Sequence, residues 1–221
     1  MSEQILTFVA AAESSPKNFA ARTRRAAATR ARLLESSAAQ LAERGYGRLA
    51  TAAVAEGAGV AHGTLFKHFA TKSDLMAATT EHVLEGAITE FLGMARAFAG
   101  KTEPMDEALR ALWAVFRSDR MQATLELYVA ARTDEALREA LRPIFSRHRA
   151  AFLDAARSLL PDAADQAEFE SNVTGILATL LGGALLWSVV PEQSFLEREL
   201  AFVDRIARGE LVRLKSSEDD E

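Results

Sequence analysis

The segment from residue 61 to residue 72 concentrates side chains that donate hydrogen bonds or carry positive charge. In chain order these are His62, Thr64, Lys67, His68 and Lys72. Ammonium, imidazole and hydroxyl groups are the ones that proteins use to hold phosphate oxygens and the edges of bases. The chemistry that this segment predicts is therefore noncovalent recognition of a nucleic acid.

The charge distribution supports this interpretation. The chain of 221 residues has a net charge of −5, but residues 17–72 carry ten Lys and Arg against three Asp and Glu. This segment therefore has a net charge of about +7, and the remainder carries about −12. A basic module on an acidic body suits a protein that neutralises phosphates with one part only. The alternative is a solvated charged face without a partner.

Helical patterns have to position these side chains, because no sustained alternating strand pattern occurs. Residues 23–44 form one apolar stripe that ends before Gly45, and two short helices are expected at 51–58 and 61–69 with Gly59 as the turn. A long helix should then run from the capping pair Thr71 and Asp74 to about Phe98. Two short helices joined by a glycine turn are typical of a helix-turn-helix.

Val60, Leu65 and Phe69 have spacings that direct them back towards Val54 and Leu41, as a small core for this motif. Gly59 fits a turn that needs a positive φ. Gly63 has no side chain to keep its backbone away from a duplex.

The sequence Leu41-Ala-Glu-Arg-Gly-Tyr46, then Val54-Ala-Glu-Gly-Ala-Gly-Val60 and Gly63-Thr-Leu-Phe-Lys-His-Phe69 with Lys72, resembles the DNA-binding domain of the tetracycline-repressor (TetR) family. The resemblance covers about 50 residues, from Arg30 to around Ala78. It implies that DNA is contacted from the start of the second helix, the recognition helix and the start of the fourth. The positions are Thr51, Ala61, His62, Gly63, Thr64, Phe66, Lys67, His68 and Lys72.

Several positions depart from the family pattern. Phe66 stands where Tyr is commoner, Ala61-His62 replace a frequent Ser-Lys pair, and Leu49-Ala50 replace a frequent Thr-Ser. Thr51 is therefore left to cap the second helix. The arginines around residues 22–30 could reach the DNA backbone or simply be solvated.

The resemblance also implies that the rest of the chain senses a small molecule and dimerises through its last two long helices. We expect those helices near 164–190 and 195–214, after others at 105–118, 121–133 and 135–159. A dimer would place two recognition helices about 34–36 Å apart on a palindromic operator. The predicted interface residues are Leu181, Leu185, Trp187, Phe195, Leu200 and Val203, with packing inside one chain as the alternative.

Large apolar side chains between residues 91 and 152 predict a pocket for a small hydrophobic effector, again with ordinary core packing as the alternative. They are Phe91, Met94, Phe98, Trp113, Phe116, Met121, Tyr128 and Phe152. Tyr128 would be a polar anchor in this lining.

Signatures of other protein classes are weak. No strand precedes the glycines of 57–63, so a dinucleotide loop lacks its context, and no nucleophile elbow or phosphate loop occurs. His82 and Glu85 could share a metal, but without an evident third ligand we interpret them as a solvated pair. The charge-free stretch 171–190 could cross a membrane, although a buried helix suits its small residues better. We expect no enzyme activity, metal, cofactor or membrane partner.

The sequence therefore predicts an all-α cytoplasmic regulator, with zero Cys in keeping with a reducing compartment. Its small N-terminal three-helix helix-turn-helix domain would be joined to a larger helical regulatory and dimerisation domain. The expected divisions are an N-terminal extension at 1–22, the DNA-binding domain at 23–78, the ligand-binding and dimerisation domain at 79–215, and an acidic tail at 216–221. We expect a repressor that binds operator DNA as a homodimer. The alternative is a helical small-molecule-binding protein with a degenerate DNA-binding head.

Overall fold

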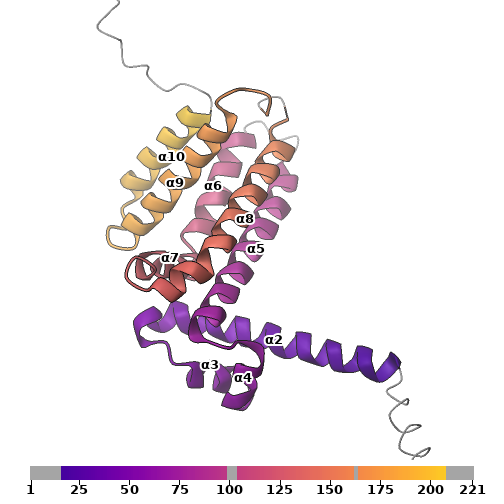
Figure 1. Cartoon of the computed structure of the whole chain (residues 1–221). Coiled ribbons are helices and arrows are strands. Elements are labelled where there is room, and N and C mark those ends of the chain that lie inside the picture. The colour runs from indigo at the N-terminus through magenta and orange to yellow at the C-terminus, as the bar shows by residue number, and fades with distance from the viewer. Residues whose placement is uncertain (1–15, 99–103, 162–163, 208–221) are drawn as a thin grey trace, which may run out of the picture.

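A computed structural model of the chain describes residues 16–98, 104–161 and 164–207. Within these ranges the regular secondary structure consists of helices, without a strand, which confirms the all-α prediction (Figure 1). The elements are α2 (Pro16–Arg44), the short 3-10 helix η1 (Tyr46–Arg48), α3 (Thr51–Gly57), α4 (His62–His68), α5 (Lys72–Phe98), α6 (Pro104–Phe116), α7 (Asp119–Ala130), α8 (Glu135–Leu159), α9 (Phe169–Trp187) and α10 (Gln193–Ala207). The predicted tail at 216–221 lies outside the described residues.

The small domain formed by α2, α3, α4 and the start of α5, here called the head, closes around its own apolar core. Leu33, Leu41, Val54, Leu65 and Phe69 are all buried there, and Val60 packs against them. Gly59 has φ 65° and Gly45 has φ 72°, a region that glycine enters without strain. The predicted core and both predicted glycine stops are therefore confirmed.

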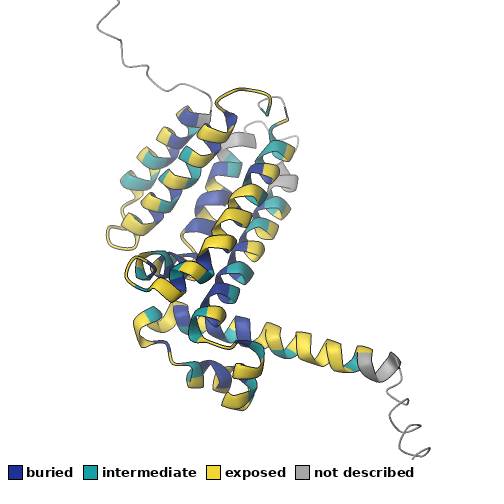
Figure 2. Cartoon of the chain, in the orientation of Figure 1, coloured by how far each residue is buried: buried dark blue, intermediate teal, exposed yellow. Residues whose placement is uncertain are grey.

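Helix α2 begins earlier than expected. It starts at Pro16, where the sequence was interpreted as a break before a helix at residue 23. The N–H groups of the first helical turn have no partner within the helix, and proline has no N–H to leave unpaired. Proline therefore suits the start of a helix as well as its end. The N-terminal half of α2 projects from the head and is exposed along most of its length (Figures 1 and 2).

Helix α5 connects the head to the larger domain, here called the body. The predicted capping box is present, since the backbone N–H of Thr71 donates to Asp74 and that of Asp74 donates to the Thr71 hydroxyl, both at 3.0 Å. Higher on α5, His82 pairs with Glu35 of α2, which Arg120 of α7 also contacts. The predicted solvated pair of His82 with Glu85 is therefore corrected, because the histidine helps to join three helices.

The body packs α5 to α10 together, with α5 against α6 and α8 and with α9 against α10. Helix α8 has the predicted bounds, and Asp134 caps its N-terminus by accepting from the Leu137 N–H at 2.9 Å. Helix α9 is shorter than the predicted 164–190. By length and mean hydropathy (1.3) α9 is apolar enough to cross a membrane, yet it contacts α6, α8 and α10 in the body.

Candidate nucleic-acid interface

The turn between α3 and α4 orients the second of these short helices. The N–H groups of Gly59 and Val60 donate to the carbonyls of Glu56 and Ala55 at 2.9 and 3.0 Å, which closes the end of α3. Leu65 then anchors α4 from inside the head, with no exposed surface. The opposite face of α4 must consequently point outward.

That outer face carries most of the predicted contact residues. Ala61, His62, Gly63, Phe66 and Lys67 are exposed, whereas Thr64 and His68 are half-buried. The Phe66 side chain is 43% exposed, a large apolar surface for a side chain on a short helix. Its ring meets that of His62 edge-on, with centroids 5.0 Å apart. A Cβ on Gly63 would meet nothing within 4 Å, so the backbone there is open to an approaching surface.

Thr51 does not cap α3 as expected. Ala50 occupies the N-cap position without a side-chain hydrogen bond, and Thr51 is the first residue of the helix. The Thr51 hydroxyl lies 3.0 Å from Nε2 of His62, so it joins the starts of α3 and α4. The capping prediction is wrong because the backbone turn places the cap one residue earlier.

Lys72 lies at the start of α5 and is partly buried. Its ammonium donates to the carbonyl of Tyr46 at 3.1 Å and lies 4.4 Å from the centre of the Tyr46 ring. Burial lowers the pKa of Lys72, and the nearby charge of Asp134 opposes this effect. An ammonium has three donors, so one bond to a carbonyl leaves donors for a phosphate.

Tyr46 joins the head to the body. Its phenol donates to Asp134 at 2.8 Å, and its backbone N–H donates to Glu126 at 3.0 Å. The chain turns sharply at Gly45, where a Cβ would lie 2.7 Å from a Glu126 carboxylate oxygen. The hydrogen bonds from Tyr46 to Glu126 and Asp134 are here called the Tyr46 clamp. The sequence patterns did not reveal them, because the two partners lie 80 and 88 positions further along the chain.

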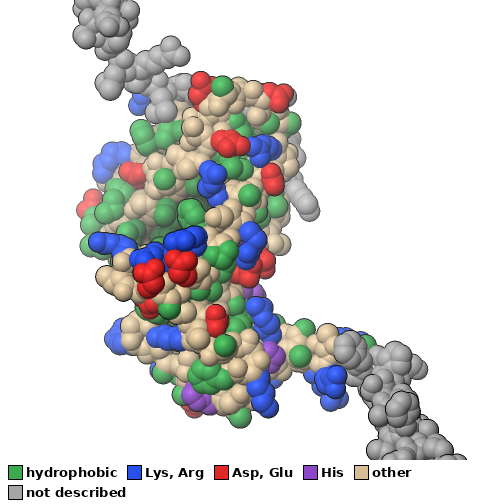
Figure 3. All heavy atoms as spheres, viewed as in Figure 1, with side chains coloured by type: hydrophobic (Ala, Val, Ile, Leu, Met, Phe, Trp, Pro, Cys, Tyr) green, Lys and Arg blue, Asp and Glu red, His purple; other side chains and the backbone are tan. Residues whose placement is uncertain are grey.

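The projecting half of α2 forms a basic arm. Its exposed arginines are Arg22, Arg24, Arg25, Arg30 and Arg32, and no Asp or Glu occurs in α2 before Glu35. In Figure 3 the charged side chains in view on the head and the described part of the arm are mostly Lys and Arg, and His side chains and apolar patches lie among them. The arm runs about 25 Å beyond the head core at the helical rise of about 1.5 Å per residue.

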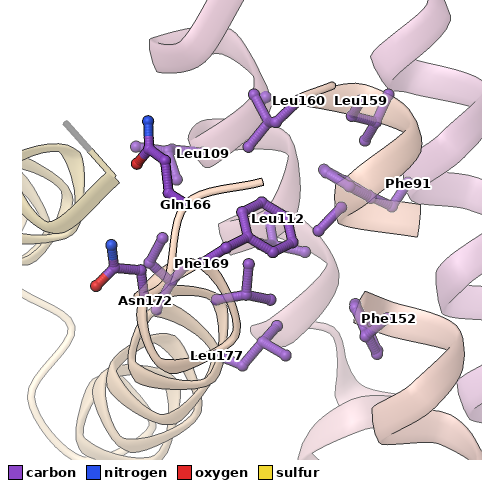
Figure 4. A pocket seen from close by; sticks show the side chains of 14 residues that line it. Phe91, Leu109, Leu112, Phe152, Leu159, Leu160, Gln166, Phe169, Asn172 and Leu177 are labelled. Carbon is purple, nitrogen blue, oxygen red and sulfur yellow. The ribbon is translucent and has the colours of Figure 1, made fainter. Parts of the chain in front are cut away.

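Two apolar pockets lie among the described residues of the body. The first, of about 120 Å³, lies between α5, α6, α8 and α9 and includes Phe91 and Phe152. In Figure 4 the amide ends of Gln166 and Asn172 lie on the side away from these two rings. The second, of about 210 Å³, contains Phe116, Met121, Tyr128 and also Phe152. The two pockets share Phe152 and Leu177, so they adjoin.

The remaining predicted pocket residues lie elsewhere. Trp113 is buried against Trp187, with ring centroids 5.9 Å apart, and lines neither pocket. Met94 packs against the main core. The side chain of Phe98 lies outside the described residues. Trp113 therefore has to be removed from the predicted lining, because its ring is used to hold α6 against α9.

The last two helices present a partly exposed apolar face. Leu185 is exposed, as are its unpredicted neighbours Leu186 and, just after α9, Val189 and Val190, and also Phe202 on α10. Trp187 and Phe195 are half-buried, and Leu181 lines the second pocket. Leu200 and Val203 are 6% and 0% exposed within a single chain. The predicted interface is corrected at these two residues, because they pack α10 onto its own body.

Comparison with known proteins gives three findings. A family model described as "Bacterial regulatory proteins, tetR family" matches residues 33–79. An HTH-type transcriptional regulator of Mycobacterium tuberculosis (strain H37Rv) is 35% identical over 174 residues, which are 78% of this chain and 89% of the relative. The HTH-type transcriptional regulator CymR of Pseudomonas putida is 35% identical over 129 residues, 57% of this chain and 62% of CymR.

Among solved structures, the multidrug binding protein EbrR complexed with ethidium is 25% identical with a TM-score of 0.61, covering 80% of this chain and 97% of EbrR. A transcriptional regulator from Rhodococcus sp. Rha1 is 22% identical with a TM-score of 0.63, covering 83% and 99% of the two chains. The likeness to the Rhodococcus structure concerns the fold alone.

Proposed function

The chain belongs to the tetR family of bacterial transcriptional regulators, and from that premise we propose that it is a repressor, released from a palindromic operator by a small hydrophobic effector. Members of this family are regulators rather than enzymes. The observation that carries the proposal is the division of α4 between a buried anchor, Leu65, and an outer face of donors and open backbone. We place the protein in the cytoplasm, where its DNA lies.

The test is a titration of the protein against the DNA flanking its own gene, by fluorescence anisotropy at two salt concentrations. Tight binding to one palindromic segment that weakens as salt rises is the expected result, because phosphate neutralisation releases counterions. Equal and weak binding to every segment would favour the alternative, a helical small-molecule-binding protein with a degenerate head.

We propose that the operator is bound by a homodimer whose interface includes the outer face of α9 and α10. Leu186, in the last turn of α9, and Val189, just after it, are 58% and 78% exposed, and Phe202 on the neighbouring helix α10 is 45% exposed. Large exposed apolar side chains gathered on two neighbouring helices often mark an interaction site. Two copies related by a twofold axis would give the helix spacing that a palindrome requires.

Replacing Leu186 and Val189 by glutamate is expected to give a monomer whose operator affinity is about 100-fold weaker, because one head must then bind alone. Sedimentation velocity and anisotropy measure the two effects. The matched control is Val129→Glu, since Val129 on α7 is also exposed, at 56%. A double variant that remains dimeric would place the interface elsewhere.

We propose that the effector binds the body pockets. Their apolar walls support this assignment, as does the description of the neighbour EbrR as a multidrug binding protein complexed with ethidium. The Tyr46 clamp supplies a mechanical connection, because Tyr128 lines the second pocket on the same helix, α7, that holds Glu126. A ligand that shifts α7 would move the head through this contact, and a coupling of about 1–3 kcal/mol would suffice.

The clamp gives a pH signature. The chain has two tyrosines, and burial raises the pKa of both Tyr46 and Tyr128 to about 12, with Asp134 contributing at Tyr46. In the folded protein the pKa of each tyrosine exceeds its ordinary value of about 10. Protonation of the two tyrosines therefore contributes fully to the stability of the folded state below pH 10, and this contribution is lost as the pH rises towards 12.

In an ultraviolet titration, the folded protein should therefore form little tyrosinate at pH 10.5, whereas the unfolded chain should be mostly ionised. Tyr46→Phe and Tyr128→Phe assign the two transitions. A normal transition near pH 10 in the folded Tyr128→Phe variant would contradict the clamp.

We also propose that the basic arm extends the DNA interface. Arg24→Gln together with Arg25→Gln should reduce the slope of log affinity against log salt, by about 0.9 for each phosphate that the arm no longer neutralises. The control is Arg138→Gln with Arg142→Gln on α8, where both side chains are exposed and pair with neighbouring glutamates. An unchanged slope in the arm variant would show that these arginines are only solvated.

A further inference from the structure

His148 on α8 is a buried histidine without a hydrogen-bond partner. Its side chain lines the second pocket, it is 8% exposed, and neither Nδ1 nor Nε2 has a partner among the described residues. Buried polar groups in proteins are almost always hydrogen-bonded, because burial removes their bonds to water. An imidazole left bare at the wall of a pocket is therefore suited to pair with something that enters.

Aromatic side chains form much of the remaining wall. Phe116, Tyr128, Phe145 and Phe152 line the pocket, and the rings of Tyr128 and Phe145 meet edge-on at 5.9 Å. Benzene fills an engineered apolar cavity of about 150 Å³. The pocket of about 210 Å³ thus has room for one ring with a short alkyl substituent. Longer substituents could continue past Phe152 into the first pocket.

The protonation of His148 restricts the polar group of such a ligand. Burial lowers the pKa of His148, as does the charge of Arg147, whereas Glu85 and Glu81 on the facing helix α5 raise it. Burial has the largest influence, so the ring is neutral at pH 7 and offers one donor and one acceptor. A hydroxyl group both donates and accepts, and it brings no charge into an apolar site.

We propose that the second pocket binds single-ring phenols or alcohols with an alkyl substituent, and that His148 is the residue that recognises their hydroxyl group. This assignment rests on the proposed ligand-sensing function of the body, whose effector it describes more closely. Arg149, exposed at the same pocket, is the residue that a carboxylate would use instead.

Calorimetric titration of the full chain without DNA tests the proposal, with 4-butylphenol, butylbenzene and 4-butylbenzoate as probes. We expect 4-butylphenol to bind at least ~10-fold more tightly than butylbenzene, the factor that about 1.4 kcal/mol of hydrogen bonding gives. His148→Leu should abolish this difference, and His148→Gln, which keeps a donor and an acceptor, should retain part of it.

Equal affinities for 4-butylphenol and butylbenzene, an undiminished preference in His148→Leu, or no binding of 4-butylphenol would each overturn the proposal. Tightest binding of 4-butylbenzoate that is lost in Arg149→Gln would also overturn it. Because DNA is absent, failure of this site is separate from failure of the head to bind an operator. The latter is measured by anisotropy with and without 4-butylphenol.

Discussion

Replacing Lys67 by glutamate is expected to weaken operator binding about 100-fold, or about 2.7 kcal/mol, while the protein stays folded. Lys67 is exposed in the last turn of α4, so a glutamate there disturbs no packing in the head core. A carboxylate at this position would face phosphates and repel them. Fluorescence anisotropy measures the affinity, and circular dichroism checks that the helices are retained.

The control for this variant is Arg117→Glu, an exposed charge reversal in the body. It changes the net charge of the protein equally but lies away from α4, so it should alter affinity only slightly. Equal losses in both variants would mean that overall charge governs DNA binding. The outer face of α4 would then have no special role.

Replacing Leu65 by alanine is expected to lower the free energy of unfolding of the head by about 3 kcal/mol. Leu65 has no exposed surface and belongs to the same core as Leu33 of α2, Val54 of α3 and Phe69. The loss is large for so small a domain, and operator binding should decline because α4 loses its anchor. Urea denaturation and hydrogen exchange at α3 and α4 measure the effect.

The matched control is Val129→Ala, because the Val129 side chain is 56% exposed on α7, outside the proposed dimer face. Truncation of an exposed valine leaves no closed cavity, so its cost should be within about 0.5 kcal/mol. Comparable losses at both positions would indicate that the head core contributes little to stability.

The head could be predicted closely from sequence, since its spacing rules are local. Gly45, Gly59 and the Thr71–Asp74 box each fix the backbone within a few residues, and all three are where the pattern placed them. The start of α2 could not be predicted in this way, because a proline after two serines is compatible with both the end of one segment and the first turn of the next.

Predictions for the body were weaker because they depend on which helices meet. The apolar stripe of α10 identifies Leu200 and Val203 as packing residues but does not say whether the partner is the same chain or a second copy. His148 lies on the stripe of Leu141 and Ile144 at helical spacing, which could have indicated that it is buried. The neighbouring Ser146, Arg147 and Arg149 are exposed, so the composition of this segment alone does not distinguish it from a solvated surface.

The contact between Trp113 and Trp187 also makes the body optically distinct from the head. These are the two tryptophans of the chain, and their rings meet edge-on between α6 and α9. Intrinsic fluorescence excited at the red edge of the tryptophan band therefore originates wholly in the body. A change in its emission on adding a small molecule would report a rearrangement of α6 against α9, without a label and without interference from the DNA-facing helices.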